Sequence, residues 1–321
     1  MSFVALALCL SVLAFTVATS AASGVSALLH AALATRLERL PAHRRASAYL
    51  SLRLAPTAAG ALFAGLIFLP AFLLFEPRNS GEQVSAAILA LTLLATVPLL
   101  RCGREAVAAW RSTRARVTGW LTDAEPLRLR DTPSCPAYVV HAPFPVVAVV
   151  GVRRPFLVVS RTVLETCSGD ELSAILAHEA THLRRRDNLK RLLMLTTPDL
   201  LAGTAAARDM ELRWQRASEE AADDGAGSQR SLDLAAALVK VARLAQGLPA
   251  PPATMAAFCR GDDIARRVTR LTADRPRARA GRVRGSLLAG LALASATALV
   301  LTAGTLESVH AVAELFVTLL Q

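Results

Sequence analysis

The sequence is poor in lysine, aromatic residues and closely spaced cysteines. Only two of its 36 basic residues are lysines, aromatic residues make up 5% of the 321 positions, and charged residues make up 19%. The five cysteines are odd in number, scattered and without a CxxC pair, which excludes a disulfide scaffold and indicates reduced thiols. Hydrophobic residues account for 53% of the chain, which excludes a disordered chain and exceeds the share in an ordinary soluble protein. The composition therefore favours a protein embedded in a lipid bilayer.

Four long stretches contain no Asp, Glu, Lys or Arg, namely residues 3–33, 54–75, 84–100 and 285–306. A helix needs about 20 apolar residues, within roughly 17 to 25, to cross the hydrocarbon core. We therefore expect an α-helical membrane protein with four transmembrane helices. The first stretch could instead be a cleaved signal peptide. It exceeds the roughly 7 to 15 apolar residues of such a peptide, however, and no basic segment precedes it, so we expect it to be retained as a span.

The arginines around these stretches predict the orientation, because Lys and Arg of short flanks remain on the cytoplasmic side. Arginines follow the first and third stretches and precede the second and fourth, whereas the connector 76–83 holds two acids and one arginine. This pattern predicts three spans within residues 1–100, a cytoplasmic domain at 101–284, the fourth span, and a short extracytoplasmic tail at 307–321. Both termini are then extracytoplasmic. The flanking arginines are Arg36, Arg39, Arg44, Arg45, Arg53, Arg101, Arg104, Arg111, Arg114, Arg116, Arg275, Arg277, Arg279, Arg282 and Arg284.

The same arginines account for the net charge of +11 without a nucleic-acid ligand. They lie beside the expected spans and lack interleaved aromatic residues, so we expect no direct nucleic-acid binding. The tail carries Glu307, His310 and Glu314 at spacings of three and four residues, which place them on one helical face. We expect this tail to form a helix at the membrane interface rather than a ligand-sensing domain.

The expected cytoplasmic domain begins with three short runs of β-branched and aromatic residues, at 138–141, 146–150 and 156–160. Proline and glycine separate the runs, as they separate strands in many small sheets. These runs therefore predict a small β-sheet ahead of the next helix.

That helix is expected to begin with a capping box, because Ser168 and Glu171 have the spacing at which each side chain bonds to the other residue's backbone N–H. Further along it lies an HExxH motif formed by His178, Glu179 and His182. Histidines four positions apart share a helical face and can bind one Zn²⁺, while the glutamate faces the water on the metal. The two histidines could also be surface residues beside a solvated glutamate, but the capping box and the apolar positions around the motif favour catalysis.

A catalytic zinc site needs a third protein ligand, and the next acidic helix offers two candidates. Glu219 and Asp223 lie four residues apart, so Glu219 can bind the metal while Asp223 accepts a hydrogen bond from a ligand imidazole. Glu220 and Asp224 form the same pair one residue further on. Such an acidic cluster is usually a solvated face, but the HExxH motif upstream favours a metal ligand in one of the two pairs.

Together, the two motifs resemble the gluzincin pattern of integral-membrane metallopeptidases, HExxH followed by ExxxD. His178, Glu179 and His182 form the first part, and Glu219 and Asp223 form the second. The resemblance implies an α+β zincin-like metallopeptidase domain in which His178, His182 and Glu219 bind Zn²⁺. Glu179 is then the general base that takes a proton from water and returns it to the leaving amine.

Longer runs resemble one family in particular, the M56 family of BlaR1/MecR1-like sensor peptidases. These runs are residues 151–160 and 176–187, and a peptidase domain between the third and fourth spans is also that family's layout. Two features depart from the family pattern. No penicillin-binding sensor domain follows the last span, so β-lactam sensing is not implied, and Ala222 precedes Asp223 where the family often has cysteine.

Several further roles follow from this interpretation. An extended substrate could pair with the edge of the sheet at 138–160. For His141 we expect a structural hydrogen bond in a strand rather than contact with an oxyanion. Asp187 is a candidate for supporting a ligand from behind, although a surface salt bridge to the arginines at 184–186 is the simpler expectation.

Two alternative functions remain. An M48-like membrane quality-control protease shares both motifs, but the run at 151–160 and the placement of the domain favour M56. A non-catalytic membrane receptor could retain a structural zinc site, although such a site has no use for Glu179. The M56 resemblance implies a cytoplasmic protein substrate, such as a DNA-binding transcriptional repressor, that is cleaved after a signal. The sequence indicates neither the stimulus nor the oligomeric state.

Overall fold

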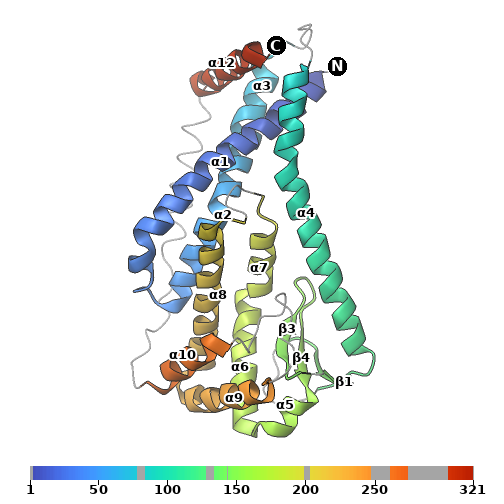
Figure 1. The fold of residues 1–321 in the computed structure, drawn as a ribbon, viewed down its shortest axis with the longest axis vertical. Coiled ribbons are helices and arrows are strands. Elements are labelled where there is room, and N and C mark those ends of the chain that lie inside the picture. Colours follow the sequence, from blue (N-terminus) through green and yellow to red (C-terminus); the bar gives the residue numbers. More distant parts are fainter. Residues whose placement is uncertain are drawn as a thin grey trace.

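The computed structural model describes residues 3–77, 84–127, 134–142, 144–198, 203–246, 261–273 and 303–320. Most of these residues are helical, and one small sheet is present. Figure 1 shows an elongated molecule in which long helices form the upper part and shorter helices with the sheet form the lower part. The predicted fourth span at 285–306 falls outside the described residues except for its last four positions, which begin helix α12 (Ala303–Leu320).

The upper part is built from α1 (Phe3–Leu37), from α2 (Ala42–Leu62) with its extension, and from α4 (Ala86–Leu121). The extension of α2 consists of a π-helical stretch η1 (Phe63–Phe68) and α3 (Leu69–Phe75), which continue the same rod. All three rods are long and apolar enough to cross a membrane. The described part of the chain therefore has the helices of a membrane protein.

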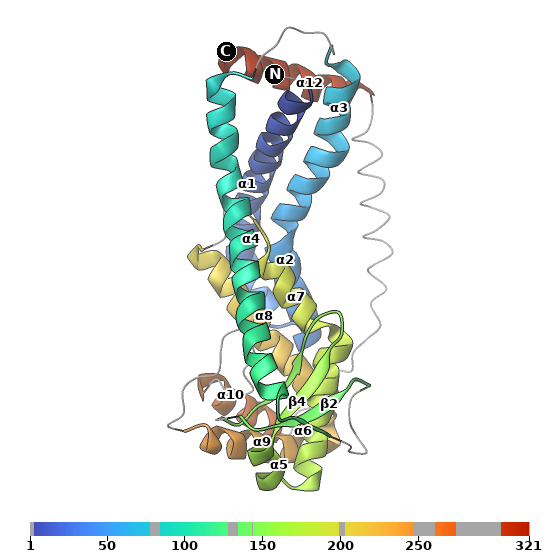
Figure 2. The ribbon, with the colours of Figure 1, turned by 90° about the vertical axis from the view of Figure 1, so that its right-hand side faces the viewer.

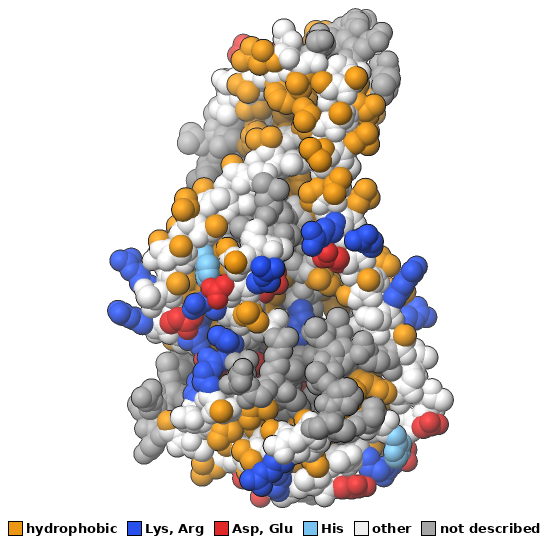
Figure 3. All heavy atoms as spheres, viewed as in Figure 1, with side chains coloured by type: hydrophobic (Ala, Val, Ile, Leu, Met, Phe, Trp, Pro, Cys, Tyr) orange, Lys and Arg blue, Asp and Glu red, His pale blue; other side chains and the backbone are white. Residues whose placement is uncertain are grey.

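The surface of these rods agrees with contact to lipid. Leucines such as Leu74, Leu94 and Leu100 remain about two-thirds exposed on the outside of the bundle, at 68%, 68% and 70%. Figure 3 shows hydrophobic side chains over the upper part of the molecule, while most charged side chains gather from the middle downward. An apolar surface this extended is costly in water and is typical of a membrane-facing surface.

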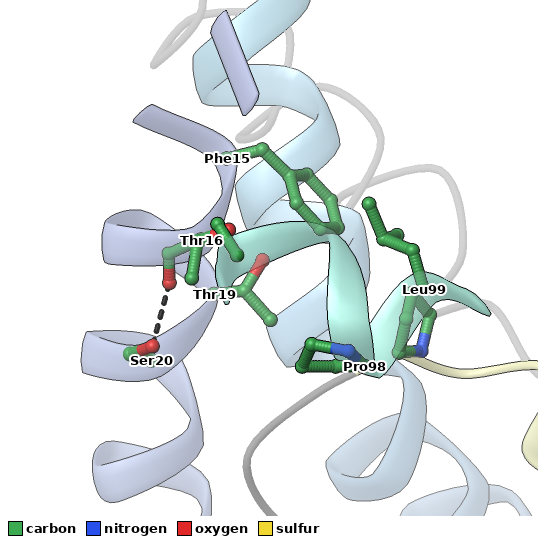
Figure 4. A pocket seen from close by; sticks show the side chains of 8 residues that line it. Phe15, Thr16, Thr19, Ser20, Pro98 and Leu99 are labelled. Atoms are coloured by element: carbon green, nitrogen blue, oxygen red, sulfur yellow. Dashed lines mark hydrogen bonds between the residues drawn. The ribbon is translucent and has the colours of Figure 1, made fainter. Parts of the chain in front are cut away.

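A small pocket between α1 and α4 is lined partly by hydroxyl groups. Ser20 donates its hydroxyl to the backbone carbonyl of Thr16 at 2.6 Å, one turn earlier on α1. Figure 4 shows Thr16, Thr19 and Ser20 beside Pro98 and Leu99 of α4 around a small pocket. Its volume of about 10 Å³ has room for roughly one water molecule, so it is too small for a larger ligand.

The helices extend further than the apolar stretches predict. The segment before residue 54, expected as a cytoplasmic loop, is largely the first half of α2, and α4 continues to Leu121 beyond the predicted end at residue 100. Tertiary packing explains why the first half of α2 is helical, because Ala46 and Tyr49 are buried against Trp214 of α8. The spans are thus continuous with helices that belong to the lower part of the molecule.

The predicted sheet is confirmed, and a fourth short strand joins it. The strand order is β1-β2-β4-β3, with β2 parallel to β4 and β3 antiparallel to β4. Strand β2 ends before His141, which is exposed and not in a strand. The strands are β1 (Glu125–Pro126), β2 (Ala137–Val140), β3 (Val147–Val150) and β4 (Phe156–Ser160).

Helices cover one face of this sheet and enclose the core of the lower part. Leu157 and Val159 of β4 pack with Ile175 of α6 and Leu238 of α9, all of them at most 1% exposed. The predicted capping box at the start of α6 is confirmed. The helices of this part are α5 (Arg161–Thr166), α6 (Gly169–Arg185), α7 (Asp187–Leu195), α8 (Ala205–Ala226), the short η2 (Ser228–Arg230), α9 (Ser231–Leu244) and α10 (Gly261–Thr272).

Candidate metal centre

Helix α6 brings the three motif residues to one buried place. His178 is fully buried, Glu179 is 5% exposed, and the Nε2 atoms of His178 and His182 lie 3.1 Å apart. The four-residue spacing produces this approach, because successive turns of a helix place both imidazoles on one face. The two rings form an edge-to-face pair with centroids 4.8 Å apart.

Helix α8 adds a carboxylate to the two imidazoles. The Glu219 oxygens lie 3.5 Å from His178 Nε2 and 3.6 Å from His182 Nε2, and the three candidate ligand atoms lie within 4.8 Å of one another. Gly225 permits this approach, since a Cβ at that position would collide with the side chain of Thr181 on α6. Of the two candidate acids, Glu219 is therefore the one that faces the histidines.

Glu220 faces a different part of the molecule. Its carboxylate pairs with Arg45 of α2 and, at 2.9 Å, with Arg266 of α10. Asp224, its expected companion, pairs with Arg270 at 2.5 Å. These two acids connect helices rather than approach the imidazoles, because a step of one residue turns a helix by about 100°.

A carboxylate holds each imidazole from behind. Asp223 Oδ1 lies 3.0 Å from His178 Nδ1, and Asp187 Oδ2 lies 2.9 Å from His182 Nδ1. Asp187 is not at the surface, as the simpler expectation had it, but is 5% exposed and also bonds to Ser218 and Lys190. The reason is a sharp turn between α6 and α7.

Arg186 makes this turn. Its φ of 53° is left-handed, and it is the only non-glycine residue with a positive φ in the described part of the chain. Its conformation ends α6 and starts α7, so that Asp187 folds back toward His182. A left-handed residue with a Cβ costs about 1 to 2 kcal/mol, which the buried bonds of Asp187 offset.

His178, His182 and Glu219 together form what we call the HExxH cluster, and its electrostatics fit a cation. With Nδ1–H directed at a carboxylate, a neutral imidazole keeps its lone pair on Nε2, and both Nε2 atoms then face each other and Glu219. Donor atoms this close need a positive charge among them, which either a proton or a metal ion supplies. The pKa of His182 also shows that its surroundings are negative. Burial alone would lower this pKa, but the carboxylates of Glu219 and Asp187 raise it to about 10. Two imidazoles and a carboxylate are also a donor set that zinc prefers.

The sequence did not reveal Arg267, which is 2% exposed on α10. It donates to Asp223 at 2.6 and 3.0 Å and lies 3.1 Å from Glu219 Oε2. The guanidinium therefore contacts both acidic residues of the ExxxD pair. It lowers the pKa of Asp223 to about 2, although burial alone would raise it. A single arginine in a basic amphipathic helix carries no sequence signal that links it to this site.

Glu179 lies between the cluster and the edge strand β3. Its Oε2 accepts a hydrogen bond from the backbone N–H of Val149 at 3.1 Å. A cavity of about 520 Å³ adjoins it, lined by Glu179 and His182 together with β3, the β3–β4 connection and the start of α7. Burial raises the pKa of Glu179, and the two histidines oppose this only in part. A carboxylate with a raised pKa, facing a cavity, is suited to proton transfer.

The described part of the chain thus combines three apolar helical rods with an HExxH helix whose two histidines face a carboxylate of α8. Residues 138–200 match the model of a family described as BlaR1 peptidase M56. This match, over 63 of the 321 residues, supports the resemblance to the M56 family that the motifs predict. The matched segment includes the HExxH motif but ends before Glu219, so the choice of Glu219 rests on geometry. No curated protein matches the chain.

Proposed function

We propose that the chain is a zinc-dependent membrane metalloendopeptidase in which His178, His182 and Glu219 bind the metal. The observation that carries the proposal is the convergence of two Nε2 atoms and one carboxylate, with an aspartate behind each imidazole. The family match to an M56 peptidase supports it independently of this geometry.

The roles of the side chains follow from their positions. A bound Zn²⁺ would polarise the scissile carbonyl and lower the pKa of its water to about 7. Glu179 takes a proton from the attacking water and returns it to the leaving amine nitrogen, since it lines the cavity beside the cluster. Asp187 and Asp223 keep the imidazoles in the tautomer that leaves Nε2 for the metal.

The substrate is proposed to bind as an extended strand along β3. This strand is at the edge of the sheet, next to α6 and the cavity. Asn188 of α7 now donates to the backbone carbonyls of Val149 at 2.8 Å and Gly151 at 3.1 Å, and Glu179 accepts from Val149 N–H. A substrate strand would replace these contacts with backbone pairing. The backbone groups of β3 with which a substrate strand would pair are thus already bonded to the side chains of Asn188 and Glu179.

We further propose that the peptidase domain is cytoplasmic and cleaves a cytoplasmic protein, such as a DNA-binding repressor. The arginines at the ends of the apolar stretches support this orientation. A topology reporter fused after Asn79 is expected to report the outside, and one fused after Ala250 the cytoplasm. The reverse pattern would place the cluster on the wrong side for a transcriptional repressor.

Metal analysis tests the zinc site directly. Purified full-length protein is expected to hold about one Zn²⁺ at the cluster, which His178→Ala and His182→Ala each remove, because two remaining ligands hold zinc too weakly. His141→Ala is the matched control, since His141 is exposed and outside the cluster. Equal zinc in all three variants would rule out the assignment.

A further inference from the structure

A second group of metal-binding side chains lies at the opposite end of the molecule. It consists of Glu76, directly after α3, with His310 and Glu314 on α12. Figures 1 and 2 show α12 lying across the top of the helical rods, beside α3 and far from α6. Under the proposed topology, this end lies outside the cytoplasm. We refer to these three residues as the outer cluster.

Helix α12 is packed firmly enough to position its part of the cluster. Val317 is 3% exposed and packs with Leu6 of α1, Phe72 of α3 and Ile88 of α4. His310 and Glu314 are four residues apart and therefore share a face of α12. The ring of His310 also lies against Phe75, with centroids 5.8 Å apart. The face that carries both side chains is thus directed at the end of α3.

The distances in the outer cluster resemble those of donors around a shared ion. His310 Nε2 lies 4.0 Å from Glu76 Oε2 and 3.8 Å from Glu314 Oε1. All three donor atoms lie within 4.8 Å of one another. These separations are too long for hydrogen bonds. Ligands at about 2.0 to 2.2 Å from a tetrahedral zinc ion lie roughly 3.3 to 3.6 Å apart, so the three donor atoms would have to move closer together around the ion.

Charge and burial also favour a cation here. The Glu76 side chain is only 2% exposed, although it stands at the end of an apolar rod. Two carboxylates within 4.8 Å of each other repel, and a cation between them removes this cost. An imidazole among the donors favours a transition metal over Ca²⁺ or Mg²⁺, which prefer oxygen ligands alone.

We propose that Glu76, His310 and Glu314 bind a divalent transition-metal ion at the end of the molecule opposite the HExxH cluster. Such an ion would tie α12 to the end of α3, which is continuous with α2. The other end of α2 packs on α8, the helix that carries Glu219. The site is independent of catalysis and stands or falls separately from the zinc peptidase assignment.

Zinc titration of full-length protein in detergent tests the proposal. In a His178→Ala/His182→Ala background, where the HExxH cluster is removed, about one Zn²⁺ should still bind. Adding His310→Gln or Glu314→Gln should weaken this binding by at least about 10- to 100-fold. Loss of a residue that only supports a ligand already weakens metal binding by roughly this factor. Glu307→Gln is the matched control, because Glu307 is exposed on the same helix and lies outside the outer cluster.

The protein without the background substitutions provides a second readout if these variants fold poorly. It should bind two Zn²⁺ in all, and Glu314→Gln should reduce this number to one. The absence of zinc binding in the background protein would overturn the proposal and leave a protonated His310 between the acids. An equal loss in Glu307→Gln and Glu314→Gln would also overturn it.

Discussion

The two clusters of histidine and glutamate differ in what stands behind their imidazoles. In the HExxH cluster, Asp223 and Asp187 hold the Nδ1 atoms of His178 and His182 at 3.0 and 2.9 Å. In the outer cluster, the ring of His310 instead packs against the ring of Phe75, with centroids 5.8 Å apart. The first arrangement fixes a tautomer by charge, whereas the second fixes a position by packing.

This difference indicates different tasks. Ligands with charged partners behind them are oriented before metal arrives, as a site for catalysis requires. A histidine positioned by packing against an aromatic ring, as His310 is, lacks this support and is better suited to binding an ion reversibly. We therefore expect the HExxH cluster to be sensitive to changes in residues that never touch the metal.

The largest effect is expected at the third ligand. Glu219→Gln should reduce zinc at the HExxH cluster from about one per chain to near zero and abolish proteolysis, because a neutral amide replaces the anionic ligand. Glu220→Gln should retain both, since Glu220 pairs with Arg45 and Arg266 instead. Metal analysis of the two purified variants provides the comparison. Zinc loss in Glu220→Gln alone would move the ligand by one residue.

The next largest effect is expected at Arg267. Arg267→Met should lower the free energy of unfolding by about 3 to 5 kcal/mol, because it leaves Glu219 and Asp223 buried without their cation. Arg266→Met should cost less than about 1 kcal/mol, since the Arg266 side chain is 45% exposed. Denaturant unfolding of full-length protein without added metal measures both. Similar losses of unfolding free energy in the two variants would show that the contacts of Arg267 with Glu219 and Asp223 have no special weight.

A smaller effect is expected from the aspartates behind the imidazoles. Asp187→Asn should weaken zinc binding by roughly 10- to 100-fold, because it removes the charge that orients His182. Asp170→Asn is the control, as Asp170 is exposed in the first turn of α6, the helix that carries His182. Competition with a zinc chelator measures the affinity. Unchanged affinity in Asp187→Asn would remove the distinction between the two clusters.

The smallest effect is expected at the strand edge. Asn188→Ala should raise the cleavage rate by about 2- to 10-fold, since a substrate strand no longer has to displace bonds worth about 0.5 to 1.5 kcal/mol. Leu192→Ala, an exposed change on the same helix, should have no effect. Quantifying the cleaved substrate over time distinguishes them. A slower Asn188→Ala variant would mean that Asn188 assists binding.

Local patterns in the sequence predicted much of the site. The capping box, the helix and the four-residue spacing of His178 and His182 are properties of a short segment, and all three are present in the structure. The spacing of residues within α8 does not distinguish Glu219 from Glu220 as the ligand, because each has an aspartate four residues later. The choice depends on which face of α8 approaches α6 and on Arg45, which lies 175 residues before Glu220 in the chain.

Features that depend on distant contacts escaped sequence reasoning. Arg267 meets Asp223 across 44 residues, and nothing in its own segment marks it. Asp187 is buried because Arg186 adopts a left-handed conformation that arginine seldom takes. The first half of α2 is a helix because it packs on α8, although hydropathy predicts only the span that follows.

A comparison of the unsubstituted protein with Glu179→Gln tests the central claim most directly. Glu179→Gln should retain about one Zn²⁺ at the HExxH cluster, because the base is not a ligand, but should lose turnover. Proteomics of new N-termini in cells should then show cleaved cytoplasmic proteins with the unsubstituted protein and none with Glu179→Gln. The same cleaved proteins in both cells, with zinc bound in both, would contradict a peptidase and favour a non-catalytic receptor with a structural zinc site.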